Sequence, residues 1–441
     1  MLAFPITFPD EVAARMNLLY LAHRIPFPPD KGDKLRAFRQ IEHLARNHTV
    51  WCACFVDDPL DQRHVAAFSQ QVHKLATIPL NRLWSITKGL AGLLAGHTVT
   101  ECFYRNAAMK ALLRRWSDSV RFDAIIAFSS GMAPHALHVT APRRVLDLCD
   151  LDSEKWKNYA NYASPPMRWL YRLEGQRLAA AERRWTSRFD AVTLVTEAEA
   201  APFRAALDRV GSVRSKVHVI GNGVALPPPS SPPLPREGPR EGSTIGFVGV
   251  MNYRPNVDAV CWFVDQCWPR IRARWPLAVF RIVGRSPSKA VRKLARVAGV
   301  EVVGAVEDVL NELRNFDVSV APLRIARGIQ NKVLEAMAAA KPVVLSPCAA
   351  EGTRGRNDEH FLIATTPDEW IAAVSRLLES PNDRIRIGQQ ARRFVAEHHR
   401  WEVELRKLET IVTDDGVRTA PIAEVTPTQL FPTTRPALTT A

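Results

Sequence analysis

The chain has 441 residues, enough for two or three domains that each bury a core of their own. Its apolar fraction of 46% and charged fraction of 24% are those of a globular protein. No apolar run is long enough for a membrane-spanning helix, and the first fifteen residues do not form a secretory signal. The net charge of +14 favours anionic partners such as nucleotide phosphates, lipid headgroups or nucleic acid.

The seven cysteines include no CxxC pair, and several lie in apolar runs such as residues 51–56. We interpret them as buried, reduced thiols of a cytoplasmic protein and predict no zinc site.

The first half of the chain predicts a doubly wound α/β domain. A strand at Asn17–Ala22 is followed by a loop rich in Pro, Lys and Gly, a helix at about Asp33–Arg46 and a strand at His48–Val56. Further strands are expected at Asp123–Phe128, Arg144–Leu148, Phe189–Val195 and Lys216–Ile220.

The segment Leu226–Gly242 holds seven prolines and predicts a semi-rigid linker. A second α/β series follows, with strands expected at Thr244–Val248, Ala278–Val283, Val300–Val303, Val318–Ala321 and Pro342–Leu345. A long helical segment at about Asp383–Val412 is expected to end the fold. The expected divisions are an extension (1–15), a first domain (16–225), a linker (226–243), a second domain (244–395), a crossover helix (396–412) and a disordered tail rich in Thr and Pro (413–441).

The most informative segment is RGIQNKVLEAMAAAKPVVLS, residues 327–346. It predicts a helix from Gly328 to Ala339, with Lys332 and Glu335 on one face near its first turn. A helix N-terminus attracts phosphate, Lys332 would add a positive charge, and Glu335 would accept ribose hydroxyls. A surface salt bridge without a ligand is the alternative that spacing alone leaves open.

This segment resembles the donor-binding helix of the retaining glycosyltransferases of family 4, which have the GT-B fold. The family shows two Glu residues separated by seven positions, then Ala-Met-Ala and Lys-Pro-Val-Val. The resemblance implies that Glu335 binds the nucleotide ribose. The first Glu, which contacts the donor sugar, is replaced by Arg327, and the amides of Gly328 and Ile329 would meet donor oxygens.

Other segments resemble the family in order. FVGVMNYRPNVDA (247–259) corresponds to a strand–Gly–basic segment, so Gly249 would allow close approach and Arg254 would meet the diphosphate. RIVGRSP (281–287) places Gly284 beside the nucleotide, while VIGNGV (219–224) and the helix with Trp401 resemble the family's domain connections.

The loop PPDKGDKLR (28–36) resembles the family's Gly-rich loop, which contacts the diphosphate and the acceptor. Gly32 would lend backbone amides, and Lys31, Asp33 and Arg36 are candidates for acceptor or phosphate contact. Without the family, the loop is equally typical of a plain turn.

Together with LDLCDLDSEKWKNYA (146–160), these motifs look like the sugar transferases associated with the exosortase A, or PEP-CTERM, system. Asp150, Asp152 and Ser153 would then line the cleft between the domains; N-capping of the next helix is the alternative. A metal site at Asp150 and Asp152 is rejected, because the family needs no metal.

The resemblance implies two Rossmann-like domains facing each other across a cleft, with the last helix crossing back to the first. It implies retaining sugar transfer without a cofactor, from a UDP-, GDP- or ADP-linked donor to a glycan or polyprenyl-linked acceptor in bacterial exopolysaccharide or cell-surface glycan biosynthesis. Arg254 and Lys332 would stabilise the departing diphosphate. A nucleotide-sugar epimerase with this fold and a catalytically degenerate nucleotide-sugar-binding protein are the alternatives.

Residues 80–116 contain a basic amphipathic segment, in which Leu83, Ile86, Leu90 and Leu93 recur at helical spacing. Such a helix favours peripheral contact with the inner face of the cytoplasmic membrane; packing on the first domain is the alternative. No helix-turn-helix, zinc finger or RNP-like strand accompanies the basic charge, so nucleic acid is not an expected partner.

Overall fold

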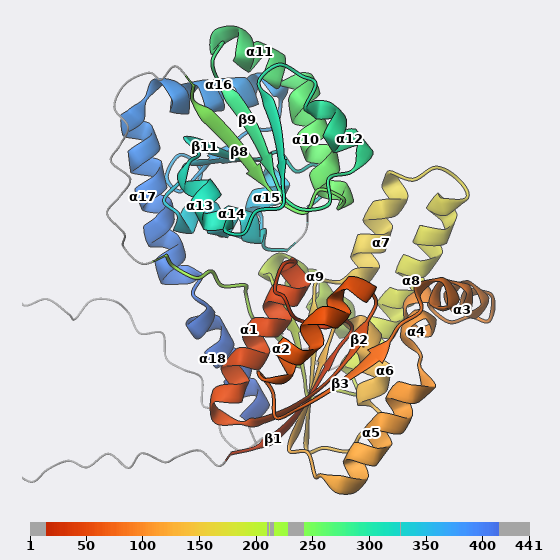
Figure 1. Cartoon of the computed structure of the whole chain (residues 1–441). Helices are drawn as coiled ribbons and strands as arrows, with labels where there is room; N and C mark the ends of the chain where they lie inside the picture. The colour runs from red at the N-terminus through yellow and green to blue at the C-terminus, as the bar shows by residue number, and fades with distance from the viewer. Residues whose placement is uncertain (1–14, 210, 212–215, 228–241, 327, 414–441) are drawn as a thin grey trace, which may run out of the picture.

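The computed structural model describes residues 15–209, 211, 216–227, 242–326 and 328–413, and Figure 1 shows two α/β domains, one above the other. The expected extension, linker and tail fall mostly outside these residues, and Arg327 falls outside them entirely.

The N-terminal domain is built on a seven-stranded parallel sheet in the order β3-β2-β1-β4-β5-β6-β7. Its strands are β1 (Asn17–Ala22), β2 (Thr49–Val56), β3 (Lys74–Pro79), β4 (Ala124–Phe128), β5 (Arg143–Cys149), β6 (Ala191–Leu194) and β7 (Val217–Val219). Its helices are α1 (Gly32–Asn47), α2 (Val65–Ser69), α3 (Arg82–Leu94), α4 (Val99–Tyr104), α5 (Ala107–Ser119), α6 (Ala133–Ala136), α7 (Asp152–Asn161), α8 (Met167–Thr186) and α9 (Glu197–Asp208), with short 3-10 turns at Pro59–His64 and Ser130–Met132.

The C-terminal domain has a six-stranded parallel sheet in the order β10-β9-β8-β11-β12-β13. Its strands are β8 (Thr244–Val248), β9 (Val279–Val283), β10 (Val300–Gly304), β11 (Val318–Ala321), β12 (Val343–Leu345) and β13 (Leu362–Ile363). The helices that follow β8 are α10 (Arg254–Gln266), α11 (Trp268–Arg274), α12 (Lys289–Leu294), α13 (Val309–Arg314), α14 (Asn331–Ala338), α15 (Pro347–Ala350), α16 (Pro367–Glu379), α17 (Pro381–His398) and α18 (Trp401–Thr413).

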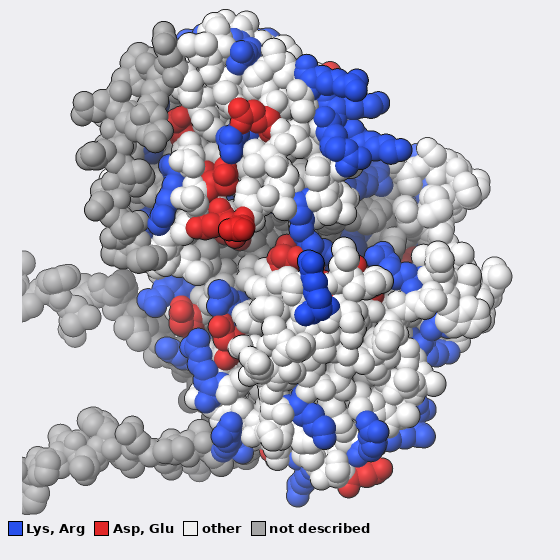
Figure 2. Space-filling view, viewed as in Figure 1, with Lys and Arg blue, Asp and Glu red and all other residues white. Residues whose placement is uncertain are grey.

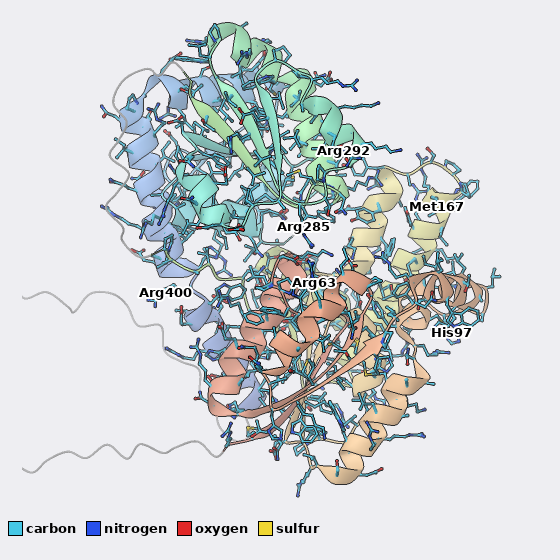
Figure 3. The ribbon with its side chains drawn as sticks, viewed as in Figure 1. Arg63, His97, Met167, Arg285, Arg292 and Arg400 are labelled. Atoms are coloured by element: carbon cyan, nitrogen blue, oxygen red, sulfur yellow. The ribbon has the colours of Figure 1, made fainter. Side chains whose placement is uncertain are left out.

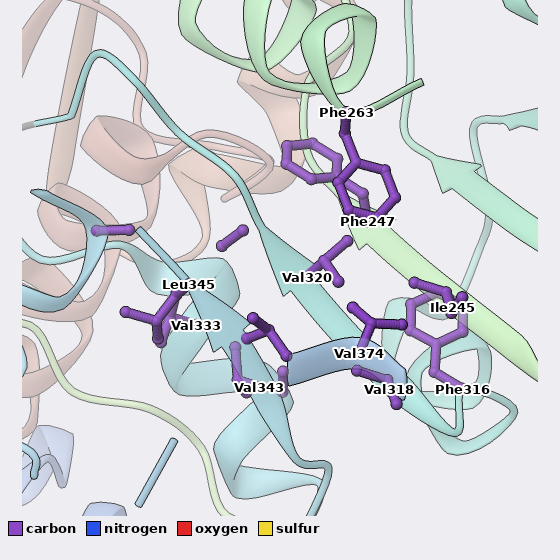
Figure 4. Close-up of a cluster of buried hydrophobic side chains, with 14 of the residues drawn as sticks. Ile245, Phe247, Phe263, Phe316, Val318, Val320, Val333, Val343, Leu345 and Val374 are labelled. Carbon is purple, nitrogen blue, oxygen red and sulfur yellow. The ribbon is translucent and has the colours of Figure 1, made fainter. Parts of the chain in front are cut away.

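Both sheets are buried on their two faces, as parallel sheets require. In the N-terminal domain, Phe38 of α1 packs on one face of the sheet, whereas Leu113 of α5 and Leu178 of α8 pack on the other. Figure 4 shows the equivalent core of the C-terminal domain, where Phe247 of β8 lies near Phe263 of α10. Because these packed cores fix the strands, they also fix the positions at which the loops leave the strand ends.

The two predicted Rossmann-like domains are confirmed, and so is the return of the chain to the first domain. Helix α18 leaves the C-terminal domain and packs its Leu405 and Leu408 into the N-terminal core beside α1. Val224, at the end of the first domain, forms an isolated β-bridge with Arg400 outside the two sheets. Its amide donates to the carbonyl of His399 at 2.8 Å. The two places where the chain passes between the domains, near Val224 and near His399, therefore lie side by side.

The helical segment expected over 383–412 consists of two helices, α17 and α18, separated by residues 399–400. His399 leaves the helical conformation between them, with φ −131° and ψ 45°, and its ring is bonded to the carbonyl of Thr353 at 2.9 Å. The break lets α17 stay on the C-terminal domain while α18 packs on the N-terminal domain.

Among the described residues, no helix is long and apolar enough to cross a membrane. The same residues contain no cluster of three or more His, Cys, Asp or Glu side chains suited to a metal ion. All seven cysteines are free thiols, and each is buried or half-buried.

Candidate active site

The carboxyl ends of strands from both domains face the boundary between them, and Figure 2 shows a charged, hollowed surface there. Gly32, the first residue of α1, lies opposite Asn331, the first residue of α14. A Cβ on Gly32 would stand 3.5 Å from the side-chain amide nitrogen of Asn331. Asn222 donates to the side-chain oxygen of Asn331 at 3.0 Å. The N-termini of α1 and α14 therefore meet across the boundary, where ligands of open α/β sheets bind.

Helix α14 begins at Asn331 rather than at the predicted Gly328, because Gly328 has a φ of +62°, outside the right-handed helical region. Lys332 and Glu335 thus occupy the first turns. Their side chains are half-buried. The Lys332 ammonium donates to the Asn256 side-chain oxygen at 2.5 Å and lies 5.1 Å from the centre of the Phe247 ring.

The two charged side chains of α14 have shifted pKa values. Burial lowers the pKa of Lys332 to about 8, against the opposing effect of the Glu335 charge. Burial likewise raises the pKa of Glu335 to about 7, against the opposing effect of Lys332. No described residue forms a hydrogen bond with the Glu335 carboxylate. Its charge is therefore poorly compensated, as in sites that bind ligands.

We expect Glu335→Gln to raise Tm by roughly 1–3 °C at pH 8 and to lose that gain toward pH 5. The pKa of Glu335 is raised in the folded state, so its ionisation weakens folding as the pH rises from the ordinary carboxyl pKa to about 7. Glutamine stays neutral throughout. Thermal melts of both proteins at the two pH values measure the effect, and an equal Tm difference at pH 5 and pH 8 would contradict it.

The two predicted glycines at the strand ends lie against each other. Gly249 donates its amide to the Val283 carbonyl at 3.0 Å, and a Cβ on Gly284 would stand 1.6 Å from the Gly249 carbonyl oxygen. Gly284 also has a φ of +148°. The backbone segments after β8 and β9 are thus in direct contact beside α10.

Gly284→Ala is expected to destabilise the protein by several kcal/mol, because a backbone segment must move to admit the methyl group. The matched control is Gly304→Ala: Gly304 has a φ of +85°, but a Cβ there meets no atom within 4 Å. Urea unfolding of both variants measures the difference. Equal losses would show that the contact with Gly249 has no energetic importance.

Arg254 is exposed and starts α10, but its guanidinium contacts the N-terminal domain. Its Nη2 donates to the Tyr162 carbonyl at 3.2 Å, and its guanidinium carbon lies 5.9 Å from the centre of the Tyr159 ring on α7. No described contact joins Arg254 to Lys332. Lys332 bonds instead to Asn256, which is two residues after Arg254 on α10, so both residues predicted to hold the diphosphate lie near the start of this helix.

Three of the predicted N-terminal site residues lie at the N-cap and in the first turn of α1. Lys31 is half-buried, Gly32 is exposed and Asp33 is half-buried. Asp33 pairs with His23 at 3.2 Å and with Arg24 at 3.3 Å. Burial opposes its ionisation, but the His23 hydrogen bond and the Arg24 charge hold the Asp33 pKa well below its usual range. Asp33 is thus an anion fixed at the start of α1.

The prediction that Arg36 contacts acceptor or phosphate is wrong, because Arg36 is fully buried inside the N-terminal domain. It donates to Asp147 at 2.9 Å, to the Ile220 carbonyl at 2.9 Å and to Asn222 at 3.0 Å. Since Asn222 also bonds to Asn331, Arg36 fixes a residue that touches α14. Arg36 is a positioning residue.

The segment after β5 divides between the boundary and the domain interior. A Cβ on Gly328 would stand 2.3 Å from an Asp150 carboxylate oxygen, so Asp150 lies against the loop before α14. Burial and the Asp152 charge raise the Asp150 pKa. Asp152 is half-buried and is bonded to Lys155 at 2.7 Å and to Ser130. The expectation that Ser153 lines the cleft is wrong, because Ser153 is buried and donates to Glu182 at 2.5 Å.

Sequence reasoning missed the asparagines that join these elements and one ion pair across the boundary. The Asn256 side chain accepts from Lys332. Asn222 accepts from Arg36 and donates to Asn331 at the start of α14. Arg285 pairs with Asp30 at 2.9 Å. All of these residues lie within motifs already singled out from the sequence. Their partners are distant in sequence, however, and no local pattern identifies the pairs.

Comparison with solved structures defines the class of fold. Sucrose-phosphate synthase from Thermosynechococcus elongatus superposes with a TM-score of 0.65 at 16% identity, over 90% of this chain and 98% of that one. The Anabaena protein HepE, in complex with UDP and glucose, gives 0.61 at 14% identity over 90% and 98%. The expected GT-B fold is confirmed.

Within the second domain, residues 242–380 match the family model described as glycosyl transferases group 1. The phosphatidyl-myo-inositol mannosyltransferase of Mycolicibacterium smegmatis is 29% identical over 213 residues, 45% of this chain and 53% of that protein. The glycosyltransferase 1 domain-containing protein 1 of Xenopus tropicalis is 24% identical over 121 residues, 27% of this chain and 35% of that protein. The chain thus matches these two curated relatives over only 35% and 53% of their own length.

Proposed function

We propose that the protein transfers a sugar from a nucleotide-sugar donor to a glycan or lipid-linked acceptor. The observation that carries the proposal is the position of Lys332 and Glu335 in the first turns of α14, where this helix meets Gly32 of the other domain. Free amides and the positive end of a helix bind phosphate, and an ionised carboxylate binds ribose hydroxyls. The group 1 family match and the UDP-bound neighbour support a nucleotide-sugar donor.

The residues divide the work between the two domains. The amides of Gly328, Ile329 and Gly32 donate to diphosphate oxygens, and Glu335 accepts from the ribose hydroxyls. The backbone at Gly249 and Gly284 borders the nucleotide. Lys332 stabilises the negative charge that develops on the departing diphosphate. Arg254 reaches the diphosphate only after leaving Tyr162, so Lys332 has the larger part. Lys31 and Asp33, at the start of α1, and Asp150 and Asp152, beside the loop before α14, border the acceptor.

We further propose that the transfer retains the anomeric configuration and needs no metal. No protein nucleophile is required when the acceptor oxygen attacks the anomeric carbon from the face that the diphosphate leaves. The bond to the diphosphate breaks, the bond to the acceptor forms, and the leaving phosphate takes the acceptor proton. NMR of the product identifies the anomer, and activity after EDTA treatment tests the metal. An inverted product, or loss of activity with EDTA, would contradict these two points.

The proposal is tested by incubating the pure protein with UDP-, GDP- and ADP-sugars, with and without a polyprenyl-linked glycan acceptor from an exopolysaccharide-producing bacterium. Transfer that requires the acceptor supports the proposal and the cell-surface glycan context of the exosortase-associated transferases. A changed sugar without acceptor identifies an epimerase. Donor binding without turnover identifies a degenerate binding protein.

We also propose peripheral contact with an anionic, cytoplasmic membrane surface through α3. Of the predicted stripe, Leu83, Ile86 and Leu90 are 78%, 46% and 44% exposed, and only Leu93 is buried, at 7%. Most of the stripe therefore does not pack on the domain, and the neighbouring Trp84 and Leu94 are also exposed, at 65% and 92%. Residues 80–98 contain no Asp or Glu. Arg177 of α8 bonds to the His97 carbonyl at 3.1 Å, which sets α3 beside the α7–α8 hairpin (Figure 1). An exposed apolar stripe flanked only by cations suits an anionic lipid surface.

Co-sedimentation with vesicles of phosphatidylglycerol and phosphatidylcholine tests this contact. Replacing Trp84 and Leu94 together by serine should reduce the bound fraction several-fold. The control is Leu60→Ser, since Leu60 is exposed on a different part of the same domain. Equal sedimentation of all three proteins would refute membrane contact through α3.

A further inference from the structure

Arg285 stands at the carboxyl end of β9, directly after Gly284, and belongs to the same rim as the Gly249 loop. Its carbonyl accepts the amide of Met251 at 2.9 Å, which holds the two strand-end loops together. Figure 3 shows the labelled Arg285 where the C-terminal domain faces the N-terminal domain. Its side chain is half-buried, so the charge is partly removed from water.

The guanidinium of Arg285 has one charged partner and two unused donors. Its Nη1 pairs with Asp30 across the boundary at 2.9 Å. Its Nε and Nη2 are shielded from solvent and bond to no described residue. A buried donor without a partner costs free energy, and guanidinium donors match the oxygens of carboxylate and phosphate. An anion with several oxygens could therefore accept hydrogen bonds from the Nε and Nη2 of Arg285.

Arg285 lies within reach of the phosphate position at α14. Asp30 contacts Arg285, and Gly32, two residues further on, lies opposite Asn331 at the start of α14. Two residues of chain span at most about 7 Å, so Arg285 and the start of α14 are neighbours along the same short loop. After burial and the Arg24 charge, the charge of Arg285 also lowers the pKa of Lys31 between them, as expected for two close cations.

We propose that Arg285 binds the donor diphosphate and that Asp30 is the intramolecular anion that the diphosphate displaces. This inference rests on the proposed function and adds a residue and a regulatory step to it. Without donor, Asp30 holds Arg285 and joins the two domains. When the donor binds, the diphosphate oxygens take the Arg285 donors that now lack partners, and the Asp30 carboxylate is released toward Lys34, which already stands 3.8 Å from it.

Calorimetric titration with UDP, GDP and ADP tests the exchange, using whichever nucleotide binds the unmodified protein most tightly. Arg285→Ala should raise the Kd about 10- to 100-fold, and Arg285→Lys should raise it less, because lysine keeps the charge but loses the fork of donors. Asp30→Asn should lower the Kd about 2- to 5-fold by removing the competing anion. The control is Arg292→Ala: Arg292 is exposed on the same domain, and its guanidinium donates to the nearby Pro287 carbonyl at 2.5 Å.

The outcomes separate the inference from the proposed function. An unchanged Kd for Arg285→Ala, with an unchanged Tm, would overturn the role of Arg285. A raised Kd for Asp30→Asn would overturn the exchange. If the unmodified protein binds none of the three nucleotides, the proposed function itself fails.

Discussion

Replacing Lys332 or Glu335 by alanine is expected to raise the Kd of the nucleotide-sugar donor about 10- to 100-fold and to leave the protein folded. The lysine change removes a partly desolvated positive charge beside the diphosphate. The glutamate change removes the acceptor of the ribose hydroxyls. Lys332 has a pKa of about 8 and Glu335 a pKa of about 7. Donor affinity should therefore fall above pH 8, where Lys332 loses its proton, and below pH 7, where Glu335 gains one.

Calorimetry between pH 5.5 and pH 9.5 measures both effects. Lys293→Ala and Glu379→Ala are suitable controls, because both residues are exposed on the same domain, away from α14. The controls should bind the donor as the unmodified protein does. Donor affinity that is equal in all variants would remove Lys332 and Glu335 from the site.

Arg36→Met is expected to lower the free energy of unfolding by about 3–5 kcal/mol. The change leaves the fully buried Asp147 carboxylate without its ion partner, with the Gln40 amide at 2.5 Å and the Cys149 amide at 2.8 Å as its remaining donors. It also frees Asn222, which touches α14. We therefore expect weaker donor binding in whatever protein remains folded.

Urea unfolding measures this loss, with Arg39→Met as the control. Arg39 lies on the same helix but is half-buried and pairs with Glu42 at 2.7 Å within one turn, so its replacement should cost less than about 1 kcal/mol. Similar losses for the two variants would show that the buried network around Asp147 contributes nothing special.

Local sequence patterns predicted best those strands whose side chains are mostly buried. Strands β1 and β8 are apolar runs bounded by turn residues, and both appear where expected. The edge strand β3 was not predicted, since most of its KLATIP side chains are only partly buried and give no clear apolar signal. The break between α17 and α18 was missed because it depends on contacts of His399 with Thr353 and Val224, which are distant in sequence.

The same distinction holds for the candidate site. Contiguous motifs predicted correctly that Gly249 and Gly284 follow the ends of β8 and β9. Their part in nucleotide binding stays a prediction. Arg36 was placed wrongly: a charged residue beside a Gly loop suggests exposure, and its partner Asp147 stands 111 positions away. The ion pair of Arg285 with Asp30 joins loops of two domains, so only the three-dimensional structure identifies it.

The central claim is that a nucleotide sugar binds where α14 meets α1. A crystal structure of the protein soaked with the best-binding nucleoside diphosphate tests it most directly. The account predicts the diphosphate at the start of α14, facing Gly32, and the ribose hydroxyls on the Glu335 carboxylate. A nucleotide bound elsewhere, with Glu335 out of contact with ribose, would contradict it.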